Sequence, residues 1–347
     1  RYTFTEPDFF YRRISIYIVL FSTLTLAFTL AFLSAHQEMT NQTTVTEFLL
    51  QGFSDVRELQ ILHFLVFLVI YLAALMGNLL IITAIALDHH LHTPMYFFLG
   101  NLSFLDVCYI SVTVPKSMVN SLNNTRLISF SGCAAQLYFG ITFAFAEVTL
   151  LTAMAYDRYV AICHPLRYRL IMTRGVCAQM AAGSWISSCI YSLCHTVNTF
   201  LLPFCGSNVV DQFFCDIPQL LKLSCADTSA NEIVVIVLSA LVGLFFFISI
   251  FVSYIHIFSA VLRIPSAQGR QKAFSTCSSH LIVVTTFYGT IIIVYMLPKS
   301  DTLRDLNKVF SVFYSVLTPL INPLIYSLRN KEVKEALSRA IHKCLLK

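Results

Sequence analysis

The stretch from Met154 to Tyr168 reads MAYDRYVAICHPLRY and lies at the end of a long apolar segment. It places Asp157 beside Arg158, and a rigid His164-Pro165 pair follows where the apolar run gives way to polar sequence. An acid and a base side by side at such a boundary can form either a structural clamp or a switch. The choice depends on how the rest of the chain is arranged around them.

The composition is that of a membrane protein. Of the 347 residues, 57% are hydrophobic and 12% are charged, and the mean hydropathy is +0.73. Such a chain is too apolar for an ordinary soluble protein. The net charge of +5 comes from 23 Lys and Arg spread in small clusters, with one Trp among the aromatic residues. This pattern argues against a nucleic-acid partner and favours the lipid bilayer.

Several apolar stretches reach the roughly 20 residues that a helix needs to cross a bilayer. They are continuously apolar and lack the alternation of a membrane β-barrel, so helices are expected. The prediction is an all-α membrane protein with a seven-transmembrane helix bundle over residues 61–328. Its spans are approximately Ile61 to Leu87, Pro94 to Asn120, Cys133 to Ile162, Val176 to Leu202, Glu232 to Leu262, Gln271 to Leu297 and Leu306 to Leu328.

Lys and Arg collect at one set of ends of these spans, and acids are common at the other. By the positive-inside rule, the C-terminus is cytoplasmic and residues 39–60 form an extracellular N-terminal segment. Residues 329–347 form a cytoplasmic tail. Apolar positions at helical spacing in this tail, among them Val333, Leu337 and Ile341, predict a short amphipathic helix on the inner leaflet.

Residues 1–38 form an N-terminal extension with three interpretations. Arg12-Arg13 before the apolar run Ile14 to Leu33 fits a signal peptide or an uncleaved anchor, although the run is long for a signal. Since Met39 opens a sensible amino terminus, the extension can also be upstream sequence that the working protein lacks. All three leave the seven-span arrangement unchanged.

Sequons and cysteines mark the expected outer surface. N-glycosylation is predicted at Asn41 and Asn123, because both start an N-x-[ST] motif outside the spans. The cysteines there are Cys133, Cys205, Cys215 and Cys225. In an oxidising compartment they allow three pairings, and spacing alone does not choose among them. No Cys and His group has zinc spacing, so no metal site is predicted.

Polar side chains inside the apolar spans are candidates for function. They are Asn78 in the first span, Asp106 in the second and Glu147 in the third. An ionisable group at that depth costs about 2.5 kcal/mol or more and usually faces the interior of the bundle. A functional role is the favoured interpretation, and hydrogen bonds that only hold helices together are the alternative.

The seventh span contains the sequence PLINPLIYSLRN, which starts at Pro319. Proline removes a backbone hydrogen bond and bends a helix, so Pro319 and Pro323 are expected to leave Asn322 and Tyr326 beside a bend. A bend can be purely structural. Its place near the cytoplasmic end favours a hinge.

Together these motifs resemble those of the rhodopsin-like G-protein-coupled receptors, and more narrowly those of the odorant receptors. The resemblance rests on LHTPMYFFLGNLSFLDVCY from Leu91, the MAYDRYVAICHPLRY stretch, Ser253-Tyr254, KAFSTCSSH from Lys272, and PLINPLIYSLRN. These motifs extend through nearly all of residues 39–330.

The resemblance implies roles for individual residues. Arg158 matches the family's G-protein switch residue, which Asp157 restrains in the resting state. The whole implied switch comprises Asp157, Arg158, Tyr159, Tyr254 and Tyr326. The polar relay, which includes the intramembrane Glu147, comprises Asn78, Asp106, Glu147, Asn322 and Pro323. The resemblance also implies the disulfides Cys133–Cys215 and Cys205–Cys225.

The outer half of the bundle offers a predicted ligand cavity. Small apolar residues with a few hydroxyls suit a neutral volatile molecule held by dispersion and one or two hydrogen bonds. A cationic amine is disfavoured, because related amine receptors carry an Asp where Gly140 stands. Tyr288 stands where rhodopsin-like receptors commonly carry tryptophan. Ordinary helix packing is the alternative for each residue. The predicted lining is Gly140, Ile141, Ala144, Phe145, Leu238, Ser239, Tyr288, Ile291, Ile292, Tyr295, Ser311 and Ser315.

The predicted function is that of an odorant receptor in the plasma membrane. A bound odorant would shift a conformational population and activate a stimulatory, olfactory-type heterotrimeric G protein, which raises cAMP. No cofactor and no enzymatic activity are expected. One alternative is a chemoreceptor of the same family that works outside olfaction. A transporter is the weaker alternative, because the sequence shows no internal symmetry with interrupted helices.

Overall fold

The computed structural model describes residues 45–123, 125–296, 304–329, 332–336 and 338–339. The N-terminal extension 1–38 and the sequon at Asn41 lie outside these residues. Asn123, the other sequon residue, is exposed and ends a helix.

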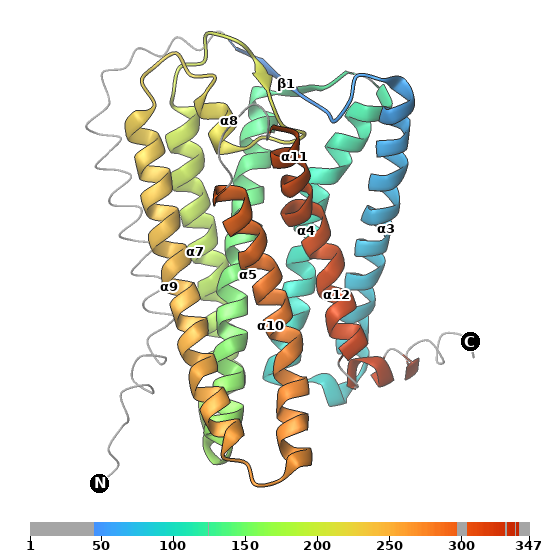
Figure 1. Ribbon diagram of the computed structural model, residues 1–347, viewed down its shortest axis with the longest axis vertical. Coiled ribbons are helices and arrows are strands. Elements are labelled where there is room, and N and C mark those ends of the chain that lie inside the picture. The colour runs from blue at the N-terminus through green and yellow to red at the C-terminus, as the bar shows by residue number, and fades with distance from the viewer. Residues whose placement is uncertain (1–44, 124, 297–303, 330–331, 337, 340–347) are drawn as a thin grey trace.

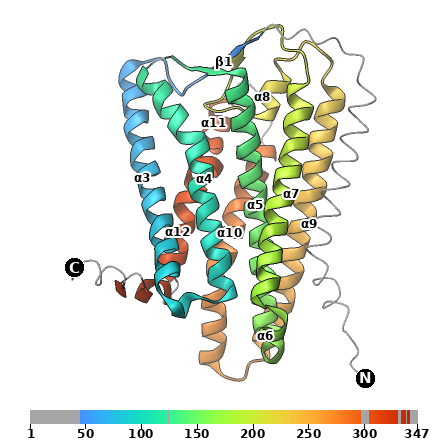
Figure 2. The same cartoon turned by 180° about the vertical axis from the view of Figure 1, so that it is seen from behind.

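Long helices run side by side as one bundle, which confirms the predicted fold class (Figure 1 and Figure 2). The bundle helices are α3 (Arg57–Leu87), α4 (Pro94–Asn123), α5 (Phe130–Cys163), α7 (Arg174–Phe200), α9 (Ser229–Leu262), α10 (Ala267–Met296), and a last one made of α11 (Arg304–Val312), the π-helical η4 (Phe313–Leu317) and α12 (Thr318–Arg329). Shorter turns connect them: η1 (His89–Leu91), η2 (Pro165–Arg167), α6 (Tyr168–Ile171) and α8 (Ile217–Leu221).

The helices differ in how apolar they are. Among the described residues, five helical stretches are long and apolar enough to cross a membrane: α3, α4, α5, α9 and Lys308–Tyr326. Helix α7 is less apolar because serines line its buried face. Ser184 donates to the Met180 carbonyl at 2.9 Å and Ser188 to the Ser184 carbonyl at 2.6 Å. These hydroxyls bond within the helix, so they need no water.

A small sheet covers one end of the bundle, here named the sheet end, at the top of Figure 1. Its strands are β1 (Glu47–Leu50), β2 (Leu127–Ser129) and β3 (Val209–Val210), in the order β2-β1-β3. β1 pairs antiparallel with β2 and parallel with β3. The sequence analysis did not predict this sheet, because strands of two to four residues carry almost no periodic signal.

Two disulfides fasten the sheet end. Cys133 at the start of α5 bonds to Cys215, with a Cα–Cα distance of 5.6 Å, and Cys205 bonds to Cys225 at 5.9 Å. Of the three pairings that spacing left open, this is the one the structure contains. A native disulfide typically stabilises a fold by about 2–4 kcal/mol, largely by restricting the unfolded chain. The long segment between α7 and α9 is thereby held against α5.

The opposite end, named the α6 end, carries a short amphipathic helix close to η1. Residues 332–336 and 338–339 are helical, and Val333 and Ala336 are buried there. Arg339 donates two hydrogen bonds to Oδ2 of Asp88, at 2.7 and 3.1 Å. These bonds hold the pKa of the Asp88 carboxyl below its usual value. The tail helix is therefore attached to the connection after α3.

Helix α3 packs tightly against α12 at a glycine. A Cβ atom added to Gly77 would lie 3.2 Å from both Cβ and Cγ of Pro323. This separation is tighter than ordinary van der Waals contact, and the proline ring cannot rotate away. A side chain at position 77 would therefore push the two helices apart.

We expect Gly77→Leu to destabilise the bundle by about 1–3 kcal/mol, as overpacking usually does. The measurement is the midpoint of thermal unfolding of the purified protein. Gly183→Leu in α7 is the matched control, because a Cβ atom added there meets no atom within 4 Å. Equal unfolding temperatures for the two variants would contradict the proposed close contact.

Candidate functional site

A buried polar cluster joins three helices in the middle of the bundle. Nδ2 of Asn322 in α12 donates to Oδ1 and Oδ2 of Asp106 in α4, at 3.2 and 3.1 Å. The same amide donates to Oε1 of Glu147 in α5 at 3.0 Å. All three side chains are at most 3% exposed. One amide thus serves two carboxyl groups that arrive from different helices.

The amide of Asn78 connects α3 to this cluster through the backbone of α12. Proline has no N–H, so Pro323 leaves the carbonyl four residues earlier, that of Pro319, without its helical donor. Nδ2 of Asn78 donates to that carbonyl at 2.9 Å and to the Ala74 carbonyl at 3.0 Å. The five residues of the predicted polar relay therefore meet in one region of the bundle.

The acid of the MAYDRYVAICHPLRY stretch has a different partner from the expected one. Oδ1 of Asp157 accepts a hydrogen bond from the Tyr168 hydroxyl at 2.8 Å. Nη2 of Arg158 instead contacts Sδ of Met95. Asp157 is 2% exposed and Arg158 8% exposed. In the described residues, Asp157 is therefore bonded to α6 rather than to its neighbour.

Tyr168 is a functional candidate that the sequence analysis did not single out, although it ends the quoted stretch. Burial, together with the neighbouring Asp157, raises the pKa of its hydroxyl. Tyr168 therefore stays protonated and remains a donor to Asp157. The spacing of 11 residues between them gave no signal, because the chain turns at His164 and Pro165 between α5 and α6.

Two tyrosines of the predicted switch, Tyr254 and Tyr326, differ in whether their hydroxyls are hydrogen-bonded. The Tyr254 hydroxyl lies 2.8 Å from Nδ1 of His280, whose Nε2 lies 3.0 Å from the Leu151 carbonyl. His280 ends the KAFSTCSSH motif, and it links α10 to both α9 and α5. The Tyr326 hydroxyl and Nε of Arg158 are buried and have no hydrogen-bond partner among the described residues.

The predicted lining residues lie in the half of the bundle near the sheet end. The Phe145 ring stacks on Tyr191 with centroids 4.4 Å apart, and the Tyr191 hydroxyl lies 3.2 Å from Oγ of Ser239. Tyr191 was not predicted. A Cβ atom added to Gly140 meets no atom within 4 Å, so there is open space beside this residue.

The other predicted lining residues differ in how deeply they are buried. Leu238 and Tyr288 are buried, whereas Ile292 is 51% exposed and contributes little to an interior wall. The Tyr288 hydroxyl is buried without a hydrogen-bond partner among the described residues. The side chain of Tyr295 lies outside the described residues. Ala144, Ile141 and Ile291 are half-buried.

The segment before Cys215 crosses the sheet end and is fastened to the last helix. Nζ of Lys308 lies 2.8 Å from Oδ1 of Asp211, and Nε2 of Gln212 donates to Oγ of Ser311 at 2.8 Å. Ser311 was a predicted lining residue, and Ser315 donates to its carbonyl at 2.6 Å. This segment therefore crosses the sheet end beside the predicted lining residues Ser311 and Ser315.

Known proteins resemble this chain in sequence and in fold. A family model described as Olfactory receptor matches residues 67–344. Olfactory receptor 14A16 of Homo sapiens is 52% identical over 303 residues, which are 87% of this chain and 98% of that protein. Olfactory receptor 13D1 of Homo sapiens is 47% identical over 346 residues, which are 99% of this chain and 98% of that protein.

Among solved structures, squid rhodopsin matches with a TM-score of 0.65 at 15% sequence identity. The match covers 88% of this chain and 93% of squid rhodopsin. At that identity the likeness concerns the fold alone.

We expect Asn322→Leu to lower the unfolding temperature, because it leaves the carboxyl groups of Asp106 and Glu147 without their shared donor. An unsatisfied buried polar group costs about 1–3 kcal/mol. Asn101→Leu is the control, since Nδ2 of Asn101 bonds only to the Phe97 carbonyl of its own helix, at 2.9 Å. If both variants unfolded at the wild-type temperature, the cluster would not stabilise the bundle.

Proposed function

Because the chain belongs to the olfactory receptor family, we propose that it is an odorant receptor for a small neutral molecule. The ligand binds in the half of the bundle near the sheet end, and binding activates a stimulatory, olfactory-type heterotrimeric G protein that raises cAMP. The family consists of multi-pass membrane receptors that have the rhodopsin fold and are not enzymes.

The observation that carries the ligand proposal is the buried Tyr288 hydroxyl, which has no partner among the described residues. A buried hydroxyl without a hydrogen bond costs about 1–3 kcal/mol. A ligand with one carbonyl or hydroxyl group would offset that cost. This hydroxyl fits an odorant with a single polar group.

The charged groups described near the predicted lining support a neutral ligand. Lys308 and Asp211 at this end neutralise each other in an ion pair, in which Nζ lies 2.8 Å from Oδ1. Gly140 offers space and no carboxylate. A cationic ligand would therefore be desolvated without compensation, which is costly in an apolar site.

At the α6 end, two buried groups favour a second conformation of the bundle. Nε of Arg158 and the Tyr326 hydroxyl have no described hydrogen-bond partner, whereas Tyr254 is held by His280. A rearrangement that provides partners for these groups gains free energy. A ligand that binds the rearranged state more tightly would populate it, as conformational selection requires.

The proposed orientation has the sheet end outside the cell and the α6 end in the cytoplasm. The two disulfides and the Asn123 sequon lie at the sheet end, where an oxidising compartment and glycosylation enzymes would reach them. Arg167 and Arg169 lie at the α6 end, as the positive-inside rule expects for cytoplasmic loops.

We expect Gly140→Trp to abolish the cAMP response of cells to the odorant that activates the wild-type receptor in a broad panel. The indole would fill the open space beside Gly140. Gly206→Trp is the control, because Gly206 is an exposed loop position where an added Cβ meets no atom within 4 Å. Surface expression is measured by antibody labelling. An unchanged odorant response in Gly140→Trp would place the ligand elsewhere.

We expect Arg158→Ala to retain odorant binding and to lose the cAMP response, because the guanidinium lies at the α6 end, away from the predicted cavity. Binding is measured on the purified receptor and cAMP in cells. A full response from Arg158→Ala would refute the switch. Odorant flux into sealed vesicles without any cAMP response would favour the transporter alternative.

A further inference from the structure

The connection between α3 and α4, at the α6 end, carries three histidines that the proposed function does not use. It reads Asp88-His89-His90-Leu91-His92 and contains the 3₁₀ turn η1. The side chains of all three histidines are exposed. Imidazole is the commonest metal ligand among side chains. A turn with accessible histidines is therefore a candidate metal site.

The 3₁₀ turn brings His89 and His92 together. A 3₁₀ helix has three residues per turn, so the side chains at i and i+3 lie above one another. The N–H of His92 closes the turn by donating to the His89 carbonyl at 3.2 Å, and the two ring centroids are 5.0 Å apart. His90 points about 120° away from this pair. Sequence spacing predicted no metal site, because it does not show that this turn is 3₁₀.

The separation of the two rings suits a shared ion. A zinc ion lies about 2.0–2.1 Å from each imidazole nitrogen, so two rings on one tetrahedral ion have centroids roughly 5 Å apart. The rings are nearly perpendicular, at 89°, and because both are exposed they can turn until a nitrogen of each faces the ion. The same distance fits an edge-to-face ring contact. A metal site therefore needs a second observation.

The hydrogen bond of His92 supplies that observation. Its Nε2 lies 3.0 Å from the Ile85 carbonyl. A carbonyl oxygen only accepts, so the proton is on Nε2, and Nδ1 of the neutral ring keeps its lone pair for a metal ion. Histidines that bind metals almost always donate their other N–H to a carbonyl, a carboxylate or water, which fixes the ring. His92 is thus held as a metal ligand would be.

The nearby carboxylate is already engaged. Oδ2 of Asp88 accepts two hydrogen bonds from Arg339, and its Oδ1 accepts one from the His90 N–H at 3.1 Å. In the described part of the chain, no group of three or more His, Cys, Asp or Glu side chains is arranged to hold a metal ion. The site therefore has a pair of protein ligands, and water completes the coordination. Imidazole nitrogens favour zinc or copper over magnesium or calcium.

We propose that His89 and His92 form a binding site for a divalent transition-metal ion of the zinc and copper class. The ion bridges the two ends of the η1 turn, and Nδ1 is the ligating atom of His92. The proposal does not depend on the odorant-receptor function, because the pair lies at the α6 end, away from the predicted ligand cavity.

An ion at this place would fix the turn to which the tail helix is attached. Asp88, which directly precedes His89, holds Arg339 of the tail by hydrogen bonds of 2.7 and 3.1 Å. On the other side of the turn, the Tyr96 hydroxyl in the first turn of α4 donates to Oε2 of Glu332 at 2.6 Å. A metal clamp between these two attachments would stabilise the tail helix in its position.

The test uses Cu²⁺ as the probe, because it is paramagnetic and heads the affinity order of the divalent first-row ions. The full-length chain is purified through an epitope tag, without a polyhistidine tag, and placed in lipid nanodiscs. Pulsed electron paramagnetic resonance counts the imidazoles that couple to the ion. We expect two coupled imidazoles at one equivalent of Cu²⁺, and displacement by excess Zn²⁺ but not by Mg²⁺. A spectrum without two coupled imidazoles would overturn the proposal.

Single variants assign the ligands. His89→Ala and His92→Ala should each leave one coupled imidazole and weaken Cu²⁺ binding by about a hundredfold, because the second ligand of a linked pair binds intramolecularly. His90→Ala is the matched control, since it removes an exposed histidine of the same turn that points elsewhere, and it should bind as wild type.

Two coupled imidazoles retained in His89→Ala, or lost in His90→Ala, would overturn the assignment. If His92→Ala failed to fold, as judged by thermal unfolding, His89→Ala would decide, because the His89 side chain is exposed.

Discussion

The amide of Asn322 holds together the part of the bundle on which the rest depends. It bonds to Asp106 of α4 and Glu147 of α5, so α12 cannot slide along either helix without breaking those bonds. Carboxyl groups at that depth are costly unless they are paired, which makes the arrangement specific. The same stretch of α12 binds α3, because Pro323 frees the Pro319 carbonyl for Asn78. Four helices are thus registered against one another by side chains that have few alternative partners.

At the α6 end, hydrogen-bonded and unpaired buried groups lie close together. Asp157 is bonded to Tyr168, and Tyr254 to His280, whereas Nε of Arg158 and the Tyr326 hydroxyl are buried without described partners. A region in which paired and unpaired groups adjoin can rearrange at low net cost, because new hydrogen bonds replace those that break.

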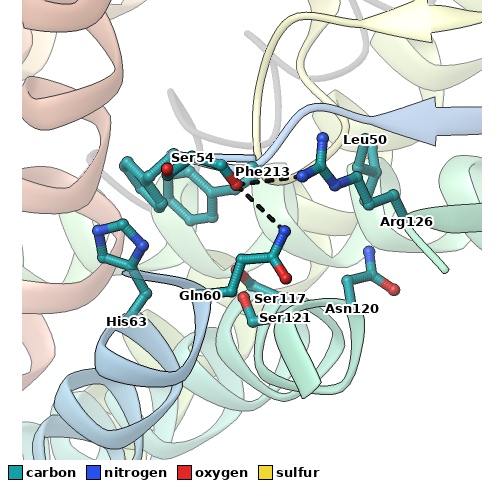
Figure 3. A pocket seen from close by; sticks show the side chains of 11 residues that line it. Leu50, Ser54, Gln60, His63, Ser117, Asn120, Ser121, Arg126 and Phe213 are labelled. Atoms are coloured by element: carbon teal, nitrogen blue, oxygen red, sulfur yellow. Dashed lines mark hydrogen bonds between the residues drawn. The ribbon is translucent and has the colours of Figure 1, made fainter. Parts of the chain in front are cut away.

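The sheet end closes the bundle by covalent and backbone contacts. The Cys133–Cys215 disulfide draws the segment after β3 across the bundle, and β1 pairs with strands on both sides. Asp211 and Gln212 on this segment contact the last helix, while Phe213 lines a small hollow at the sheet end (Figure 3). One short segment is therefore bonded both to α5 and to the last helix.

The sequence by itself determined the seven-helix membrane fold, since long apolar runs in lipid must satisfy their backbone hydrogen bonds within helices. It also singled out Asn78, Asp106 and Glu147, because polar residues in such runs are few, and the resemblance to rhodopsin-like receptors grouped them with Asn322. Only the tertiary structure decided which partners they take. Asp157 bonds to Tyr168 because the chain turns after α5, and Asn120 lines a hollow because separate segments meet there. Periodicity reports local structure, whereas these contacts depend on how distant segments pack.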